Sequence, residues 1–330
     1  MIPSAIDKVM SSFSSIRSRV DESLLASHIE RIRRVWRVYA PRINPYIDRA
    51  RVAGIDSGYN YIEYRGYALY VVDVTWVIVD PDEGESWDGD ADADILSSSG
   101  IEAELAAYSI AMEIEALRKV LDQVDLVLVD GSLIAKFWTL MRARDQGLEI
   151  EALKGVSMKR ALDELCLTLS LYPSKVAFIA KNSSAKDVLG LVKGDVYYFE
   201  RYTSEPGYSR PIPLTESSQR GMDGLARAFQ RYCHNVSGMH LDIFVSYIRF
   251  EPHTRVYRLE YVVEEGCDPE DRLRMIMNIA SQTVVRGYPY PLYRADQLAR
   301  VSDSDIERLA VVLGIASDPT ARAGLWAGYP

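Results

Sequence analysis

The sequence predicts an α/β protein whose sheet begins with antiparallel strands. Residues 51–56 form a short apolar run that leads into a turn, and residues 67–79, rich in Val and Tyr with one Trp and one Thr, have the composition of one or two long β-strands. Residues 101–124 contain neither Gly nor Pro and predict one long helix. Two short apolar strands, at residues 125–130 and 175–180, then flank a segment of helical spacing at residues 155–170. Strands, a helix and a strand–helix–strand unit follow in the order of an α/β sheet.

Residues 5–40 predict a helical arm. Apolar residues recur there at three- and four-residue spacing, and several arginines lie near the end. Pro41 and Pro45 end this pattern. We therefore expect residues 1–45 to form an arm that packs on its own domain or on a partner subunit, and residues 46–330 to form the main domain.

The spacing of apolar residues and the positions of turn-forming residues predict the secondary structure of the rest of the chain. The acidic run at residues 80–94 is expected to be a solvated loop, because it lacks the Gly and Glu positions of a calcium-binding loop. Residues 195–265 alternate in a β-like way. The clearest strands within this region are expected at residues 241–250 and 255–263. The remaining helices are expected at residues 269–285 and from near Ser302.

Composition excludes several classes of protein. The chain has 330 residues, 48% of them apolar, so it can bury a large core without disulfides or structural metals. Its net charge of −9 argues against coating nucleic acid by bulk electrostatics. The longest apolar stretch, residues 68–79, contains Asp73 and is too short for a membrane span, and the N-terminus lacks a signal-peptide pattern. Three distant cysteines form no C-x-x-C motif, so we expect a protein of the reducing cytoplasm.

Common catalytic motifs are missing from the sequence. It contains no G-x-x-x-x-G-K-[ST], no G-x-G-x-x-G and no G-x-S-x-G. Its four scattered histidines form no zinc pattern. Carboxylates remain as the candidates for chemistry.

Two aspartates directly follow short apolar strands. Asp56 leads into Ser-Gly, and Asp130 leads into Gly-Ser. Acids at the carboxyl ends of adjacent strands would meet at the edge of the sheet where α/β proteins bind ligands. Like charges so close are unfavourable unless a cation lies between them, so the pair predicts a metal site. The alternative interpretation is that each Asp only caps an ordinary turn.

The helix expected at residues 101–124 carries four acids that could face this pair. Periodicity does not select among them, and most must be solvated. They are Glu102, Glu104, Glu113 and Glu115.

The chain contains four motifs in sequence: the Asp in "GIDSG" followed by a helical Glu, the Asp in "LVDGS", Lys181 in "IAKNS", and "GYPYPLYRADQLA" at residues 287–299. Together they resemble the NurA family of archaeal and bacterial nucleases. Each motif is weak alone, but the four occur in the family's order over about residues 50–300.

The resemblance implies an α/β fold with an RNase H-like mixed sheet flanked by helices, an N-terminal helical arm and C-terminal β/α additions. It also implies a homodimer with a central channel. The implied activity is Mn²⁺-dependent (or Mg²⁺-dependent) cutting of DNA by a two-metal mechanism. That activity is 5′-to-3′ on single and double strands and endonucleolytic on single strands. The implied partner is a hexameric HerA-type translocase in DNA end resection for recombinational repair.

The resemblance also implies roles for individual residues. Asp56 and Asp130 match the family's metal ligands. Glu113 is the preferred helical ligand because it lies 17 residues before Asp130, as the family spacing requires, and Glu115 is the second choice. Lys181 would stabilise charge near the scissile phosphate.

The C-terminal motif contributes two further residues. Tyr288 would line the site. Asp296 stands where the family has His, and it is expected to replace that His as a metal ligand. The alternative is that Asp296 only forms a surface ion pair with Arg294 or Arg300.

Two other functions remain open from the sequence. One is a nuclease-like structural partner of a DNA motor with reduced activity. The other is an RNase H-like enzyme that acts on RNA or on transposon ends. Retention of the acids and of Lys181 favours the active DNA nuclease.

Overall fold

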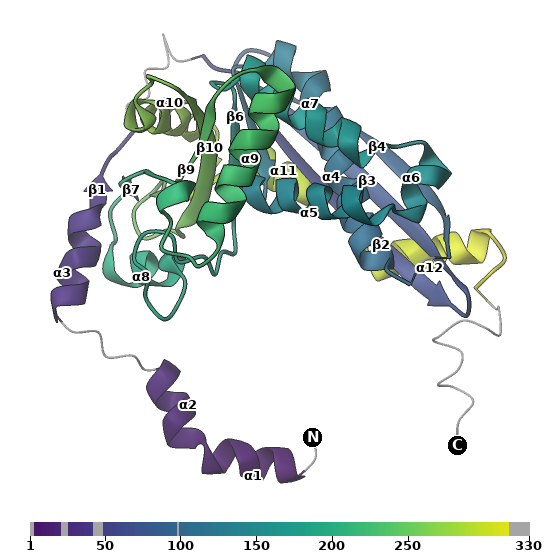
Figure 1. Ribbon diagram of the computed structural model, residues 1–330, viewed down its shortest axis with the longest axis horizontal. Coiled ribbons are helices and arrows are strands. Elements are labelled where there is room, and N and C mark those ends of the chain that lie inside the picture. The colour runs from purple at the N-terminus through teal and green to yellow at the C-terminus, as the bar shows by residue number, and fades with distance from the viewer. Residues whose placement is uncertain (1–2, 21–25, 42–48, 98, 317–330) are drawn as a thin grey trace.

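A ten-stranded mixed sheet forms the centre of the protein in the computed structural model, which describes residues 3–20, 26–41, 49–97 and 99–316 (Figure 1). The strand order is β4-β3-β2-β5-β6-β10-β9-β7-β1, and β8 pairs with β9. A separate two-stranded sheet joins β11 and β12. The strands are β1 (Trp36–Val38), β2 (Val52–Tyr64), β3 (Tyr67–Asp80), β4 (Gly84–Leu96), β5 (Leu126–Asp130), β6 (Val176–Ala180), β7 (Gly207–Ser209), β8 (Ile212–Pro213), β9 (Leu241–Arg249), β10 (Tyr257–Glu264), β11 (Val284–Val285) and β12 (Tyr288–Pro289).

The order and directions of five strands confirm the RNase H-like core. β4, β3 and β2 are antiparallel neighbours, whereas β2, β5 and β6 run parallel. Two antiparallel connections followed by parallel crossovers are the topology that the fold class predicts. Antiparallel strands β10, β9, β7 and β1 extend the sheet beyond β6.

Helices cover both faces of the sheet (Figure 1). α4, α5, α7 and α9 form the core on one face, and α10 and α11 form the core on the other. The helices are α1 (Pro3–Ser11), α2 (Phe13–Val20), α3 (Ala26–Val35), α4 (Ile101–Val120), α5 (Leu133–Gln146), α6 (Glu149–Lys154), α7 (Met158–Leu171), α8 (Asp195–Tyr202), α9 (Met222–Ser237), α10 (Pro269–Ser281), α11 (Tyr290–Leu298) and α12 (Asp303–Val312).

The predicted loop at residues 80–94 is wrong, because most of it is edge strand β4. β4 pairs with β3 along its whole length. Acids of β4 form ion pairs with neighbouring helices: Nζ of Lys154 in α6 lies 3.0 Å from Asp92 Oδ1 and 2.7 Å from Asp94 Oδ2. Edge strands tolerate such charges, which discourage further pairing. The acidic composition therefore concealed the strand pattern.

Three other segment predictions need correction. Residues 36–38 pair with β7 as a strand rather than continuing the helix of the arm. The β-like region at 195–265 also contains helices α8 and α9, whereas its two clearest strands are confirmed as β9 and β10. The helix expected at 269–285 ends at Ser281. Helices α5 and α6 were not predicted.

A disulfide joins Cys166 of α7 to Cys233 of α9, 67 residues apart in the chain. A chain of this size does not need a disulfide to bury its core, and the bond was not predicted from the sequence. Both cysteines are buried in the core. Closing a loop of this length stabilises the fold by roughly 4 kcal/mol in the chain-entropy account. The spacing of the cysteines gave no sign of the bond, because two helices far apart in sequence bring them together.

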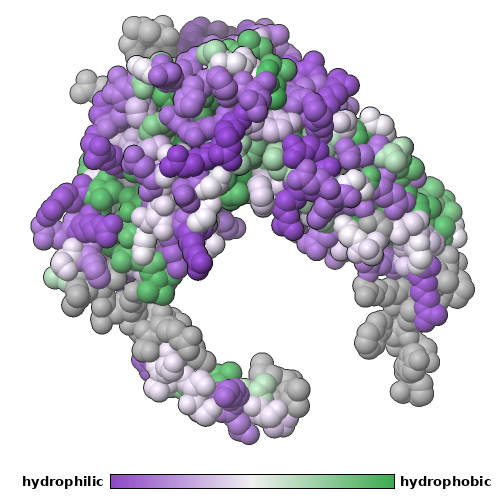
Figure 2. All heavy atoms as spheres, in the orientation of Figure 1, coloured by the Kyte–Doolittle hydropathy of each residue, from purple (hydrophilic) through white to green (hydrophobic). Residues whose placement is uncertain are grey.

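The N-terminal segment divides into two parts. α1 and α2 stand clear of the body, and apolar atoms are visible on them (Figures 1 and 2). Ile6, Met10 and Phe13 are exposed there. α3 instead packs against α8, with Ile32 fully buried. None of the helices in the described residues is long and apolar enough to cross a bilayer.

Candidate active site

Asp56 and Asp130 lie side by side on neighbouring parallel strands. The parallel pairing of β2 with β5 ends at Ile55 and Val129, so each aspartate is the next residue along its strand. Neighbouring strands are about 4.8 Å apart. The strand of Asp56 does not end there, contrary to expectation, because β2 continues to Tyr64 in its pairing with β3. Asp56 is the first residue of β2 beyond its pairing with β5.

The structure separates the four glutamates of α4. Glu113 is buried, and Ser57 Oγ donates a 2.6 Å hydrogen bond to its Oε1. Glu104 is buried elsewhere, where it accepts from the backbone of α6. Glu102 and Glu115 are exposed, and Glu115 pairs with a lysine on the surface. Of these four acids, Glu113 is the one that hydrogen-bonds to Ser57, the residue after Asp56.

A lysine that the sequence analysis did not select also reaches this cluster. Lys136, in the first turn of α5, forms an ion pair with Glu113. Its side chain is mostly buried. The turn before α5 contains Gly131, whose φ of +94° a residue with a side chain rarely adopts. That turn connects the strand of Asp130 to the helix of Lys136.

Lys181 connects Asp130 to Asp296. Its Nζ lies 3.2 Å from Asp130 Oδ1 and 2.5 Å from Asp296 Oδ1. Tyr288 completes the group, since its hydroxyl donates to Asp130 Oδ1 at 3.3 Å and its ring lies beneath Lys181 Nζ. Asp296 thus pairs with Lys181 rather than with its neighbours in sequence, and Arg294 pairs with Glu85.

Two glycines of β2 let α11 approach the sheet closely. A Cβ on Gly54 would lie 2.3 Å from the backbone N of Leu292, and one on Gly58 would lie 2.0 Å from the carbonyl O of Ala299. The glycines that flank Asp56 in "GIDSG" therefore have a packing role. They allow α11 to bring Asp296 to Lys181.

Gly58→Ala is expected to displace α11, because the new methyl group collides with backbone. The expected result is a loss of about 1–3 kcal/mol in the free energy of unfolding, with lower activity. Gly224→Ala is the matched control: no atom lies within 4 Å of its Cβ, and alanine favours the α9 helix. Urea unfolding of the two variants measures the difference. Equal stability of Gly58→Ala and wild type would contradict this account of the packing.

Charge repulsion and burial both act on Asp56. Burial and the neighbouring charges of Asp130 and Glu113 raise the pKa of Asp56 to about 8, against the opposite effect of Lys181 and Lys136. The burial of Lys181 lowers its pKa, but Asp130 and Asp296 outweigh that effect and raise it. Burial, followed by Asp130 and Asp56, raises the pKa of Tyr288. Lys181 is therefore charged and Tyr288 protonated at neutral pH.

The donors of this cluster fit a divalent cation in their chemistry. Asp56, Asp130 and Glu113 offer carboxylate oxygens, which Mg²⁺ and Mn²⁺ prefer. Burial and charge repulsion together raise the pKa of Asp56, and a cation would remove the repulsion. Over the described residues, no three His, Cys, Asp or Glu side chains are arranged to hold an ion as they stand. Instead, Lys136 forms an ion pair with Glu113, and Lys181 forms one with Asp130.

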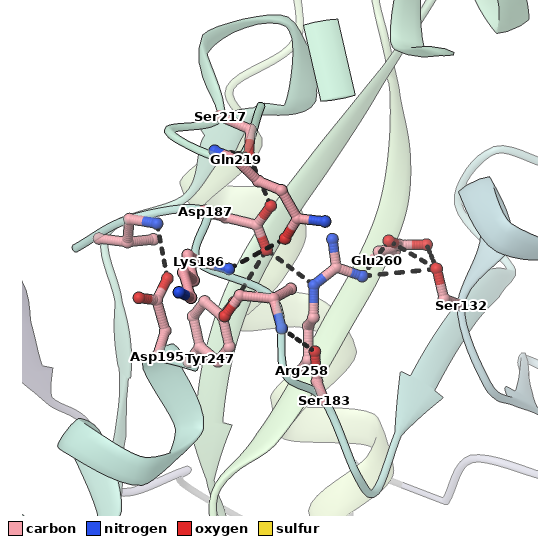
Figure 3. A network of polar contacts seen from close by, with 12 residues as sticks. Ser132, Ser183, Lys186, Asp187, Asp195, Ser217, Gln219, Tyr247, Arg258 and Glu260 are labelled. Atoms are coloured by element: carbon pink, nitrogen blue, oxygen red, sulfur yellow. Dashed lines mark hydrogen bonds and ion pairs between the residues drawn. The ribbon is translucent and has the colours of Figure 1, made fainter. Parts of the chain in front are cut away.

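A buried polar network supports the turn after Asp130 (Figure 3). Glu260 of β10 accepts hydrogen bonds from Ser132 Oγ at 3.0 Å and from the backbone N of Ile134 at 3.0 Å. Arg258 forms ion pairs with Glu260 and with Asp187. β10 thereby holds the N-terminus of α5. Local sequence patterns did not predict this network, since the β-like alternation of residues 195–265 shows no sign of buried charge and Ser132 and Asp187 lie outside it in the chain.

The sequence of the chain matches one family of known proteins. Residues 50–301 match the NurA domain. The chain is 23% identical over 324 residues to the DNA double-strand break repair nuclease NurA of Sulfolobus acidocaldarius, covering 93% of this chain and 92% of that protein. It is 24% identical over 307 residues to the protein of the same name from Sulfurisphaera tokodaii, covering 87% and 86%.

Solved structures show the same fold. The NurA nuclease from Sulfolobus solfataricus superposes with a TM-score of 0.72 at 19% identity, covering 95% of this chain and 97% of that one. A structure of NurA bound to dAMP and manganese gives a TM-score of 0.57 at 12% identity, covering 95% and 98%.

Proposed function

The chain belongs to the NurA family, and on that premise we propose that it is a metal-dependent DNA nuclease whose site is the Asp56–Asp130 cluster. The observation that carries the proposal is the meeting of Asp56 and Asp130 on adjacent parallel strands, with Glu113 hydrogen-bonded to the neighbouring Ser57. The names of its relatives support DNA as the substrate and a nuclease as the enzyme class. The manganese in a NurA structure supports Mn²⁺ as the cofactor, with Mg²⁺ as the alternative.

The residues have distinct parts in the proposed reaction. Asp56, Asp130, Glu113 and Asp296 would hold the ions, and a bound divalent ion supplies positive charge to the phosphate and lowers the pKa of water. Lys181, kept charged by its acidic neighbours, stabilises negative charge near the scissile phosphate. Tyr288 keeps its proton and orients Asp130 through their hydrogen bond.

The direct test is digestion of labelled single-stranded DNA, double-stranded DNA and RNA with Mn²⁺, with Mg²⁺ and with EDTA. We expect cutting of both forms of DNA with Mn²⁺ and none with EDTA. End-labelled substrates read the polarity, which we propose is 5′ to 3′, and closed circular single strands read endonucleolytic cutting. Preference for RNA would support an RNase H-like enzyme of another class. Absence of cutting under all conditions would support a structural partner of a DNA motor.

Asp296→Ala is expected to lower the metal-dependent rate about 10–100-fold, the usual effect of losing a group that supports a metal site. The reason is that Asp296, which is proposed to hold an ion, also contacts Lys181 from its position on α11. Asp296→His should retain much of the activity, because imidazole can also bind a metal, and it should shift the preference between Mn²⁺ and Mg²⁺. Rates in each metal provide the measurement. Full activity of the alanine variant would exclude Asp296 from the site.

Finer points of the function rest on the family resemblance. We propose a homodimer that works with a hexameric HerA-type translocase in the resection of DNA ends. The two-part division into an arm of residues 1–45 and a domain of residues 46–330 belongs to the same proposal. A protein that acts on chromosomal DNA is expected in the cytoplasm. The disulfide between Cys166 and Cys233 is compatible with that location, because intracellular proteins of hyperthermophiles also contain disulfides.

Removal of residues 1–25 is expected to weaken self-association and leave cutting of short DNA intact. The deletion removes the exposed apolar side chains of α1 and α2, which are proposed to contact a partner subunit, whereas the body keeps its core. A longer deletion, through residue 40, would remove the buried side chains of Ile32 and Trp36 and damage the fold. Sedimentation of both proteins measures the change. An unchanged mass of the truncated protein would contradict the proposed role of the arm.

A further inference from the structure

A cavity of about 640 Å³ opens directly beside the candidate site. We call it the Arg255 cavity; residues 181–184, Gly194, Val196, Tyr197, Glu200 and Arg255 line it. Its volume is in the range of cavities that bind small ligands. Lys181 belongs to both the cavity and the Asp56–Asp130 cluster. A polymeric substrate whose phosphate reaches Lys181 therefore has this cavity directly beside it.

The lining of the Arg255 cavity favours an anion. Arg255 is exposed and forms no salt bridge within the described segments of the chain. Asn182 and Ser184 are also exposed and offer further hydrogen-bond donors. The single acid in the lining, Glu200, accepts a hydrogen bond from the backbone N of Val256 at 3.0 Å. A guanidinium group without an acidic partner is well suited to bind a phosphate through two hydrogen bonds.

Aromatic surface accompanies these donors. Tyr197 lines the cavity, and Lys193 Nζ lies 4.0 Å above the centroid of its ring. Alternation of cations with aromatic rings is typical of surfaces that bind single-stranded nucleic acid, where rings contact bases and cations contact phosphates. Lys193 and Arg255 thus place two cations around the ring of Tyr197, near the candidate catalytic acids.

Buried contacts fix the wall of the cavity in place (Figure 3). Asp187, in the loop after β6, accepts hydrogen bonds from Ser217 Oγ at 2.7 Å and from Tyr247 OH at 2.8 Å, and it pairs with Arg258. Asp195, at the start of α8, accepts from the backbone N of Val188 at 2.6 Å. Asp187 and Asp195 are fully buried. The loop that carries Asn182 and Ser184 is therefore held by the core and forms a preorganised wall.

From these observations we propose that the Arg255 cavity binds the single-stranded DNA backbone beside the scissile bond, with Arg255 on the neighbouring phosphate. The proposal rests on the nuclease function proposed above. It assigns Arg255 to substrate binding and leaves the chemical step to the Asp56–Asp130 cluster. A substrate with one phosphate has nothing to place in the cavity, so its cutting does not depend on Arg255.

The test compares two substrates in Mn²⁺: a long oligothymidylate, and the p-nitrophenyl ester of thymidine 5′-monophosphate, which has a single phosphodiester. For Arg255→Ala we expect KM for the oligothymidylate to rise roughly tenfold, the loss expected for one charge-assisted hydrogen bond, with kcat unchanged. The slope of log affinity against log salt should fall by about one. Both constants for the ester should stay at wild-type values. Arg255→Lys should keep the salt slope and recover part of the affinity.

Arg65→Ala is the matched control. Arg65 is an exposed arginine nine residues beyond Asp56, at the turn between β2 and β3, roughly 30 Å along the extended strand. It should behave as wild type with both substrates. An unchanged KM of Arg255→Ala for the oligothymidylate would overturn the inference, as would an equal loss with the ester. A wild-type protein that cuts neither substrate would instead contradict the proposed function.

Discussion

Asp130→Asn is expected to lower the rate of DNA cutting about a thousandfold or more while the protein stays folded. The substitution removes a charge that faces Asp56 and contacts both Lys181 and Tyr288. Asparagine keeps the shape of the side chain, so the neighbouring strands have no reason to rearrange. Losses of this size are typical when one member of a catalytic group is removed. Rates with Mn²⁺ and thermal unfolding are the two measurements.

The second aspartate provides a test of shared action. Asp56→Asn should have a similar effect, and the double variant should be little slower than either single variant, because one cluster is already broken. Glu115→Gln is the matched control, since Glu115 lies on the same helix as Glu113 but is exposed. It should cut at close to the wild-type rate. Additive losses for the two aspartates, or wild-type cutting by either variant, would remove them from the site.

Arg258→Met is expected to lower the free energy of unfolding by about 3–5 kcal/mol, the usual cost of leaving buried charges without a partner. Arg258 is 3% exposed and pairs with Asp187 and Glu260, which are 0% and 1% exposed. Without Arg258, both acids would remain in the core without their cation. The methionine occupies a similar volume but supplies no charge. Urea unfolding with the disulfide intact measures the loss.

The control for this prediction is an arginine in an exposed pair. Arg160 is 74% exposed and pairs with Glu164 in α7. Arg160→Met should change the free energy of unfolding by less than about 1 kcal/mol, as is usual for surface ion pairs. A loss for Arg258→Met as small as that for Arg160→Met would contradict the cost assigned to the unpaired buried acids. If Arg258→Met is insoluble, Arg258→Lys, which keeps the charge, should fold with a smaller loss.

The parts of the fold that the sequence predicts are those with local signals. The apolar strands that precede Asp130 and Lys181 have continuous hydrophobic runs, and α4 lacks any helix breaker. Adjacent parallel pairing then brings Asp56 and Asp130 together as the order of elements suggests. Strand β4 was missed because its charges pair with helices that are distant in sequence.

The parts that the sequence does not predict depend on long-range contacts. No local pattern connects Glu260 with Ser132, or Lys136 with Glu113, because each pair forms only after the sheet has assembled. The bond between Cys166 and Cys233 has the same origin. Periodicity alone also left four candidate acids on α4, and burial in the folded chain distinguishes them.

Direct measurement of Mn²⁺ binding tests the central claim, that Asp56 and Asp130 form a metal site. Isothermal titration of the wild-type protein with MnCl₂ should show saturable binding in the absence of DNA. The Asp56→Asn and Asp130→Asn variants should lose that binding, whereas Glu115→Gln should keep it. Binding that is unchanged in both aspartate variants, in proteins that unfold at the wild-type temperature, would contradict the assignment of the site.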